Sequence, residues 1–110
     1  MNSELLALGA EVGQRLKDRG QTIAVCESSA GGLVSASLLA VPGASAYFLA
    51  GTVVYTVVAS KNLLKGVVPI PEGLRGASEA YALYQAQSVR GKLGADWGTG
   101  EAGATGGLGR

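Results

Sequence analysis

The chain has 110 residues, enough for one small domain, which excludes a two-domain architecture or a repeat array. Hydrophobic residues make up 47% of it, enough for a packed core, whereas charged residues make up only 15%, against about 25% in an average soluble chain. Nine basic and eight acidic side chains give a net charge of +1, so no overall charge recruits nucleic acid or an anionic membrane.

The first part of the chain predicts a helix, a strand and a second helix. Ser3 can cap the first helix and Arg19-Gly20 can end it. Its apolar stripe follows helical spacing and consists of Leu5, Leu8, Val12 and Leu16. Residues 22–26 are apolar and partly β-branched, which predicts a buried strand. A turn at 28–32 then leads to a second helix, ended by Pro42-Gly43.

The next elements predict a strand over 47–56 and a short helix over 59–65. After a proline-containing loop, Ser78 can cap a longer helix that Gly94 ends. The apolar stripe of that helix consists of Ala82, Ala86, Val89 and Leu93. Residues 95–101 predict a third strand.

This order of elements is typical of a three-layer α/β/α sandwich with a largely parallel or mixed sheet. The 33 consecutive uncharged residues from Ser28 to Ser60 agree with strands and helices covered on both faces. They do not predict a membrane span, because Pro42-Gly43 interrupts the apolar residues well short of about 18 in a row. Eight of the 18 glycines fall in the last twenty residues, so we expect that end to be either a flexible loop or a sheet whose C-terminal elements are missing.

Two scarce residue types limit the possible chemistry. No histidine is present, which excludes Ser-His-Asp and Cys-His catalysis and every histidine-ligated metal site. A single cysteine, Cys26, cannot close an intrachain disulfide, and the N-terminus does not resemble a signal peptide. We therefore expect a protein of a reducing compartment, the cytoplasm, whose general base is Lys, Tyr, Asp or Glu.

The turn after the first strand is the first candidate site, because ligands of open α/β sheets bind beyond the carboxyl ends of the strands. Gly31 and Gly32 let backbone N–H groups approach a ligand, and the helix N-terminus adds a positive dipole. A serine at this junction either caps the helix or presents a nucleophilic hydroxyl beside oxyanion donors. Glu27 and Glu101 are both expected at strand ends facing this cleft, where each either serves the site or is a solvated carboxylate.

Two further candidates follow the second and third strands. Past the second strand come Tyr55, Thr56, Ser60 and Lys61. A lysine partly withdrawn from water can act as a base in a Ser–Lys pair, although Lys61 can equally be a surface lysine and Tyr55 a core residue. Residues 98–106 are rich in glycine and either contact a phosphate or ribose or form a flexible tail. They match neither a P-loop nor a dinucleotide fingerprint.

Taken together, these residues resemble the CinA C-terminal domain family over essentially all 110 residues. The resemblance lies in four blocks: Ala-Val-Cys-Glu-Ser-Ser-Ala-Gly-Gly at 24–32, Val-Pro-Gly-Ala-Ser-Ala-Tyr-Phe at 41–48, Gly-Ala-Ser-Glu at 76–79 and Leu-Gly-Ala-Asp at 93–96. The first two blocks are the more specific. Members of this family are nicotinamide-mononucleotide deamidases, so the resemblance implies hydrolysis of that nucleotide to nicotinic acid mononucleotide and ammonia, with no metal or other cofactor.

The resemblance also implies a catalytic set. The family's nucleophilic serine falls on Ser28 and its tyrosine on Tyr55. Counting forward from Tyr55 places the family's lysine at Ser60, whereas counting back from Gly66 places it at Lys61. We take Lys61 as the base, with a one-residue insertion after Tyr55. In a regular helix without a bulge, that slip turns the side chain by about 100°.

The nucleotide phosphate is expected to lie against the glycine-rich loops, with backbone N–H groups of 29–32 holding the oxyanion. The expected substrate-binding residues are Glu27, Ser29, Gly31, Gly32, Gly103, Thr105 and Gly106. Three departures from the family pattern are the run Thr56-Val57-Val58-Ala59, Ala102 at a hydroxyl position and Gly107 at a proline position. The altered run after Tyr55, Ala102 and the expected absence of the last elements of the sheet favour the alternative of a catalytically silent nucleotide-binding or assembly module. The expected partners are a small-molecule nucleotide and further copies of the chain, since a small core with an unfinished sheet favours a homo-oligomer.

Overall fold

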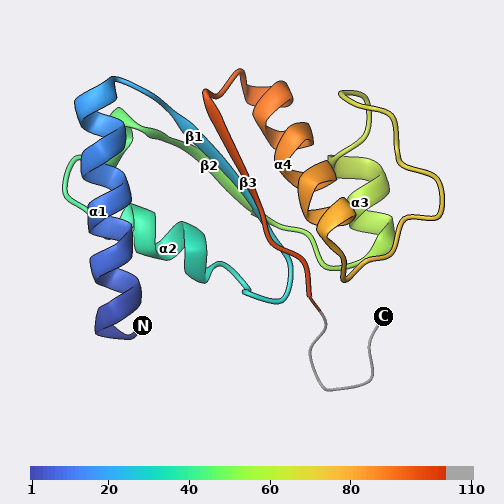
Figure 1. Ribbon diagram of the computed structural model, residues 1–110, viewed down its shortest axis with the longest axis horizontal. Helices are drawn as coiled ribbons and strands as arrows, with labels where there is room; N and C mark the ends of the chain where they lie inside the picture. Colours follow the sequence, from blue (N-terminus) through green and yellow to red (C-terminus); the bar gives the residue numbers. More distant parts are fainter. Residues whose placement is uncertain (104–110) are drawn as a thin grey trace.

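The computed structural model describes residues 1–103 as three layers around a parallel sheet (Figure 1). Its elements, in chain order, are the helix α1 (Ser3–Arg19), the strand β1 (Ile23–Glu27), the helix α2 (Leu33–Leu39), the 3-10 helix η1 (Ala44–Ala46), the strand β2 (Phe48–Val53), the helices α3 (Val57–Leu63) and α4 (Glu79–Leu93), and the strand β3 (Trp97–Gly100). The strands lie in the order β2-β1-β3, and both pairs are parallel. The predicted α/β fold is confirmed.

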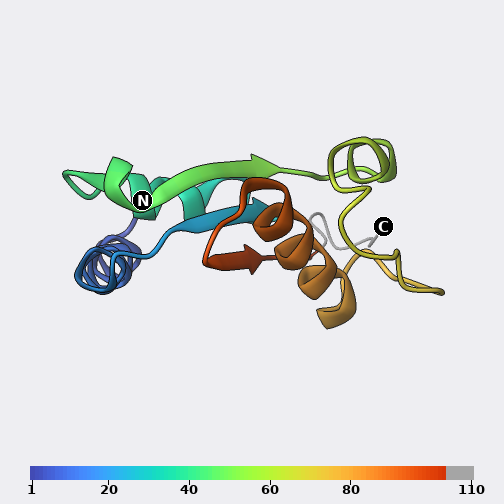
Figure 2. The same ribbon diagram turned by 90° about the horizontal axis from the view of Figure 1, so that it is seen from above.

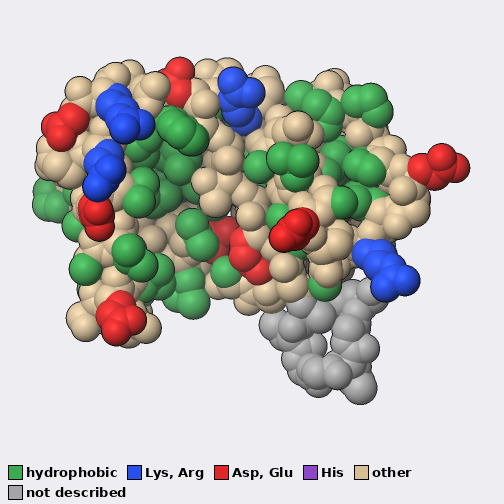
Figure 3. Space-filling model, viewed as in Figure 1, with side chains coloured by type: hydrophobic (Ala, Val, Ile, Leu, Met, Phe, Trp, Pro, Cys, Tyr) green, Lys and Arg blue, Asp and Glu red, His purple; other side chains and the backbone are tan. Residues whose placement is uncertain are grey.

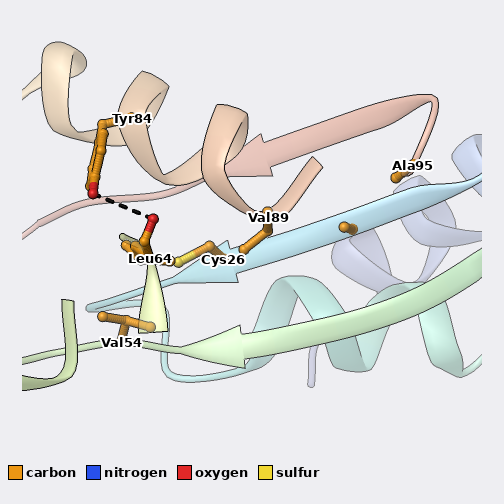
Figure 4. Packing of buried hydrophobic residues seen from close by; sticks show 7 residues of the cluster. Cys26, Val54, Leu64, Tyr84, Val89 and Ala95 are labelled. Carbon is orange, nitrogen blue, oxygen red and sulfur yellow. Dashed lines mark hydrogen bonds between the residues drawn. The ribbon is translucent and has the colours of Figure 1, made fainter. Parts of the chain in front are cut away.

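The central strand β1 is buried along its whole length, between helices on both faces of the sheet. Figure 1 shows α1 and α2 on one side of the sheet, α4 on the other and α3 beyond the end of β2, and Figure 2 shows the strands between α1 and α4. Alternate residues of β1 enter two separate cores. Ala24 and Cys26 join the core beneath α4 (Figure 4), which also contains Val54, Leu64, Tyr84, Val89 and Ala95. Ile23 and Val25 join the core beneath α1 and α2, with Leu16, Leu38, Ala44 and Tyr47.

The register of the sheet brings the carboxyl ends of its strands together. Glu27 pairs with Val53 of β2, and Cys26 pairs with Gly100 of β3. The chain segments that follow the three strands therefore leave the sheet at the same end. Those segments carry most of the residues that the sequence analysis selected.

The predicted apolar stripe of α1 is wrong in its middle. Leu8 and Val12 are exposed, whereas the buried residues of the helix are Gly9, Gly13 and Leu16. A Cβ at Gly9 would overlap the backbone of α2, and one at Gly13 would overlap a buried tyrosine ring. The buried face of α1 thus runs through Gly9 and Gly13 and not through Leu8 and Val12, because α2 and the tyrosine ring leave no room for a side chain there.

The stripe of α4 is also only partly as predicted, because Val89 is buried but Leu93 is 46% exposed. Ala82 and Ala86 lie directly over Gly100 and Gly98 of β3, where any Cβ on the strand would meet helix backbone. The remaining buried residues of α4 are Tyr84, Gln85 and Ser88. Within the described part of the chain, the Gln85 amide and the Ser88 hydroxyl make no hydrogen bond.

The helix ends differ slightly from prediction. Asn2, not Ser3, caps α1, since its side-chain oxygen accepts a 2.8 Å bond from the Leu5 amide. Thr56 caps α3 through a bond from the Ala59 amide, so this helix starts two residues earlier than expected. Ser78 caps α4 as predicted.

No helix within residues 1–103 is long and apolar enough to cross a membrane. On the face shown in Figure 3, charged side chains are scattered and no large patch carries one sign. Both β2 and β3 have one edge without a strand partner in the described chain. Self-association through these edges stays a prediction.

Candidate active site

A cleft of about 850 Å³ lies beyond the carboxyl ends of the strands. Three walls enclose it. The first is formed by the turn after β1 together with the segment after β3, and the second is the start of α3. The third is the loop between α3 and α4 together with the start of α4. Four of the predicted site residues line it together, namely Ser28, Tyr55, Lys61 and Gly103. Ser60, the other candidate for the lysine position, lines it as well.

Ser28 is only 7% exposed, and its backbone amide donates a 2.8 Å hydrogen bond to Glu101 Oε1. Its hydroxyl makes no hydrogen bond to any residue of the described chain. The alternative in which Ser28 caps the second helix is wrong, because Gly32 occupies the N-cap position of α2 and makes no side-chain cap. The hydroxyl is therefore available to a group in the cleft.

Glu27 caps α2 from inside the protein. It is completely buried, and its carboxylate accepts bonds from the backbone amides of Gly32 (3.2 Å), Val34 (2.9 Å) and Ser35 (2.9 Å). The Ser35 hydroxyl donates a fourth bond, of 2.7 Å. Glu27 is not a solvated carboxylate and does not line the cleft, and its predicted role in substrate binding stays a prediction.

Glu101 holds the turn between β1 and α2 from the other side. It accepts bonds from the backbone amides of Ser28 and Ala30 and from the Ser29 hydroxyl, at 2.8, 2.9 and 2.6 Å. Burial alone raises the pKa of Glu101, but these three bonds outweigh burial and leave the pKa below its ordinary value. Glu101 is thus held as a carboxylate that fixes the backbone on both sides of Ser29.

These two carboxylates change the expected oxyanion site. The amides of Ala30 and Gly32 donate to Glu101 and Glu27, and the Gly31 amide donates to the Ser28 carbonyl. Of the amides from 29 to 32, only that of Ser29 makes no hydrogen bond within the described residues. The turn therefore offers one free N–H group beside Ser28.

Tyr55 and Lys61 come from the segment after β2. Tyr55 is 37% exposed and lies beyond the end of β2, so it is not a core residue. Because α3 is a regular helix that starts at Val57, Ser60 and Lys61 are consecutive helical positions, and both side chains line the cleft. Within residues 1–103, the Lys61 ammonium makes no hydrogen bond or ion pair.

The glycines divide into separate roles. Gly31 and Gly32 adopt positive φ angles of 64° and 101°, which the sharp turn into α2 requires. Gly103 lies in the cleft, against the Ser29 hydroxyl. Thr105 and Gly106 lie outside the described residues, and their predicted roles stay predictions.

The wall that the α3–α4 loop contributes was not predicted from the sequence. The apolar and aromatic residues of this wall are Ile70, Pro71, Leu74, Tyr81 and Tyr84, and Arg75 lies among them. Burial raises the pKa of the Tyr81 phenol, which keeps it protonated. The block Gly-Ala-Ser-Glu at 76–79 was the available signal, since it lies between Arg75 and Tyr81.

Cys26 does not line the cleft. The thiol of Cys26 is fully buried beneath the cleft, and burial raises its pKa. No group of three or more Cys, Asp or Glu side chains in the described part of the chain is placed to hold a metal ion.

The fold and the cleft define a class of protein: a three-layer α/β domain with a cleft, lined in part by Ser28, at the carboxyl ends of a parallel sheet. The family model that describes the CinA C-terminal domain matches residues 6–110. The chain is 39% identical over 104 residues to a CinA-like protein of Synechococcus sp. (strain RCC307), and 43% identical over 104 residues to one of Synechocystis sp. (strain ATCC 27184 / PCC 6803 / Kazusa). These alignments cover 92% and 91% of this chain. The chain belongs to the CinA C-terminal domain family.

Solved structures agree with this assignment. The competence damage-inducible protein A (ComA) from Klebsiella pneumoniae superposes with a TM-score of 0.74 at 29% identity, over 84% of this chain and 57% of that one. CihA from Agrobacterium tumefaciens, a competence/damage inducible protein, gives a TM-score of 0.76 at 26% identity, over 87% and 58%. The chain spans about a quarter of the length of the two CinA-like relatives, 25% in each case.

Proposed function

We propose that this chain hydrolyses the carboxamide of a nicotinamide nucleotide, converting nicotinamide mononucleotide and water to nicotinic acid mononucleotide and ammonia. The observation that carries the proposal is that Ser28, Tyr55 and Lys61 line one cleft, although they come from two different segments of the chain. The family resemblance assigns these three side chains to catalysis.

The Ser28 hydroxyl is the nucleophile. Its oxygen attacks the carboxamide carbon while the hydroxyl proton passes to the amine of Lys61, directly or through Tyr55. The tetrahedral intermediate then collapses, the C–N bond breaks, and the proton leaves with the departing ammonia. A water molecule attacks the resulting Ser28 ester, gives up a proton to the same base, and releases the carboxylic acid and the free hydroxyl.

The oxyanion of each tetrahedral intermediate needs hydrogen-bond donors. The Ser29 amide is the free donor of the turn, and it directly follows the nucleophile. Glu101 accepts bonds from the Ser28 and Ala30 amides and so fixes the orientation of the Ser29 amide between them. The carboxylate thereby serves as a positioning group and stays outside the cleft lining.

The lining of the cleft suits a nucleotide with an aromatic base. Its apolar and aromatic wall can cover a pyridine ring, and a ring buried there gains roughly 25 cal/mol for each Å² of apolar surface removed from water. Lys61 and Arg75 are the basic side chains of the lining, and the Arg75 guanidinium stays cationic while the Lys61 amine acts as the base. The substrate is therefore expected to carry an anionic group.

A second function, nucleotide binding without turnover, is favoured by one observation. Three of the four amides expected to hold the oxyanion are already used by the protein itself. Exposed Val57 and Val58 also stand where family members carry polar residues beside the site. A silent module would bind the nucleotide and release no ammonia.

Ammonia release from nicotinamide mononucleotide by the purified chain tests the proposal. Wild-type protein should release ammonia and nicotinic acid mononucleotide in equal amounts, and Ser28→Ala should lower kcat by about 10³-fold or more. Lys61→Ala should lose activity to a similar degree. Ser45→Ala and Lys92→Ala, which alter exposed residues outside the cleft, are the matched controls and should retain activity. Saturable binding without ammonia release would establish the silent module instead.

A further inference from the structure

We propose that Arg75 binds the phosphate of the nucleotide, and that the glycine turn at 28–32 does not. The inference rests on the proposed function for the identity of the nucleotide. It assigns a substrate-recognition role to a residue of the α3–α4 loop that the sequence analysis did not select.

The glycine turn is closed to a phosphate on two grounds. Its backbone N–H groups are the usual anion donors of such a turn, and here all but that of Ser29 bond to Glu27, Glu101 or the Ser28 carbonyl. The two carboxylates also place negative charge directly behind the turn, where it repels an anion. Only the Ser29 amide is left to donate to a ligand, and a single N–H group does not make a phosphate site.

The cleft instead presents positive charge on its other walls. Lys61 and Arg75 line it, and none of its lining residues is an aspartate or glutamate. Within residues 1–103 the one ion pair joins Arg15 to Glu11 on the exposed face of α1, so neither cation of the cleft is neutralised by a carboxylate. An anionic group in the cleft therefore meets the unpaired Arg75 guanidinium, and no carboxylate among the described lining residues competes for it.

Arg75 and Lys61 differ in their position in the cleft and in the chemistry of their side chains. Lys61 lies on α3 and is the proposed base for Ser28. Arg75 lies on the α3–α4 wall, beside the apolar residues that would cover the base and ribose. Its guanidinium has a planar fork of donors that matches two oxygens of one phosphate, a geometry that an ammonium group lacks.

The backbone at Arg75 is anchored to the start of α4. The Ser78 hydroxyl donates a 2.6 Å bond to the Arg75 carbonyl and accepts a bond from the Tyr81 amide. The same serine thus caps α4 and fixes the backbone that carries the guanidinium. A loop residue held in this way loses less conformational freedom when it binds a ligand.

Equilibrium binding to Ser28→Ala protein separates recognition from turnover. The two ligands are nicotinamide mononucleotide and nicotinamide riboside, which differ only in the phosphate. Ser28→Ala should prefer the mononucleotide, and adding Arg75→Gln should weaken its binding about tenfold or more while leaving the riboside within about twofold. Arg75→Lys should restore part of the loss. Arg19→Gln, an exposed substitution outside the cleft, is the control and should change neither affinity.

Three results would overturn the inference: equal binding of the two ligands, no measurable binding of either at millimolar concentration, or a preference for the mononucleotide that survives Arg75→Gln. Because Arg75 is exposed, unfolding curves should show an unchanged fold in these variants. Ammonia release is measured separately, with protein that retains Ser28. Arg75-dependent binding without ammonia release contradicts only the deamidase, whereas ammonia release with an Arg75→Gln defect equal for both ligands contradicts only the phosphate site.

Discussion

The glycine turn at 28–32 and the wall built by the α3–α4 loop differ in how well the sequence indicates what each of them can bind. The turn looks like an anion site in the sequence, yet Glu27 and Glu101 bind most of its amides and make it rigid. The wall carries no recognisable phosphate motif, yet it supplies an unpaired arginine and most of the apolar lining of the cleft. A glycine-rich turn is thus an anion site only where the protein leaves its N–H groups unused.

This contrast predicts that changes behind the turn reduce stability, whereas changes in the wall reduce substrate binding. Glu27→Ala should have the largest effect, because it leaves three backbone amides and the Ser35 hydroxyl without their acceptor. We expect a loss of about 4 kcal/mol in the free energy of unfolding, measured by urea denaturation. Glu72→Ala, which removes an exposed carboxylate, should stay within about 0.5 kcal/mol. An equal effect of both substitutions would mean that Glu27 does not hold the turn.

Ile70→Ala tests the wall. Ile70 is 57% exposed, so its truncation should change the free energy of unfolding by less than about 1 kcal/mol. Loss of its apolar cover should raise KM for nicotinamide mononucleotide about tenfold, with little change in kcat. Steady-state kinetics and an unfolding curve on the same preparation check both. Lower stability with an unchanged KM would remove the wall from substrate binding.

Glu101 predicts how the stability of the turn depends on pH. Its pKa is lowered in the folded protein, so folding favours the carboxylate. The stability it contributes is fully present above the unfolded-state pKa, near pH 4.3, and is lost as the pH falls through the lower folded-state pKa. Glu101→Gln should therefore flatten the decline of unfolding free energy below about pH 5. An unchanged acid decline would show that Glu101 is not held as a carboxylate.

Ser28→Ala should have the smallest effect on stability. The Ser28 hydroxyl makes no hydrogen bond within residues 1–103, so its removal should change the free energy of unfolding by less than about 0.5 kcal/mol. Ser35→Ala is the comparison, since it removes a hydroxyl bonded to buried Glu27, and should cost about 1–2 kcal/mol. Thermal unfolding of the two variants gives the difference. A larger loss for Ser28→Ala would assign its hydroxyl to the structure of the turn.

The sequence predicted the fold class, the strands and the position of Ser28, because these depend on local patterns. Apolar β-branched runs, helix caps and the turn after β1 are encoded within a few residues of one another. The predicted apolar stripe of α1 was wrong because Gly9 and Gly13 contact another helix and a tyrosine ring. The local spacing of apolar residues does not show these contacts.

The roles of the two carboxylates and of Arg75 depend on distant contacts. Glu101 reaches the turn only because β3 pairs with β1, which brings together residues 73 positions apart. Arg75 faces the cleft because α4 packs back onto the sheet and carries the preceding loop with it. No motif marks such a residue in one sequence, and only the α/β topology places it.

The central claim is that Ser28 and Lys61 act as one unit in a chain without histidine. A double-mutant comparison of ammonia release tests it most directly, using wild type, Ser28→Ala, Lys61→Ala and the double variant. If the two side chains act as a unit, the double variant should be no slower than the slower single variant. Losses that multiply in the double variant, or full turnover in Lys61→Ala, would contradict the claim.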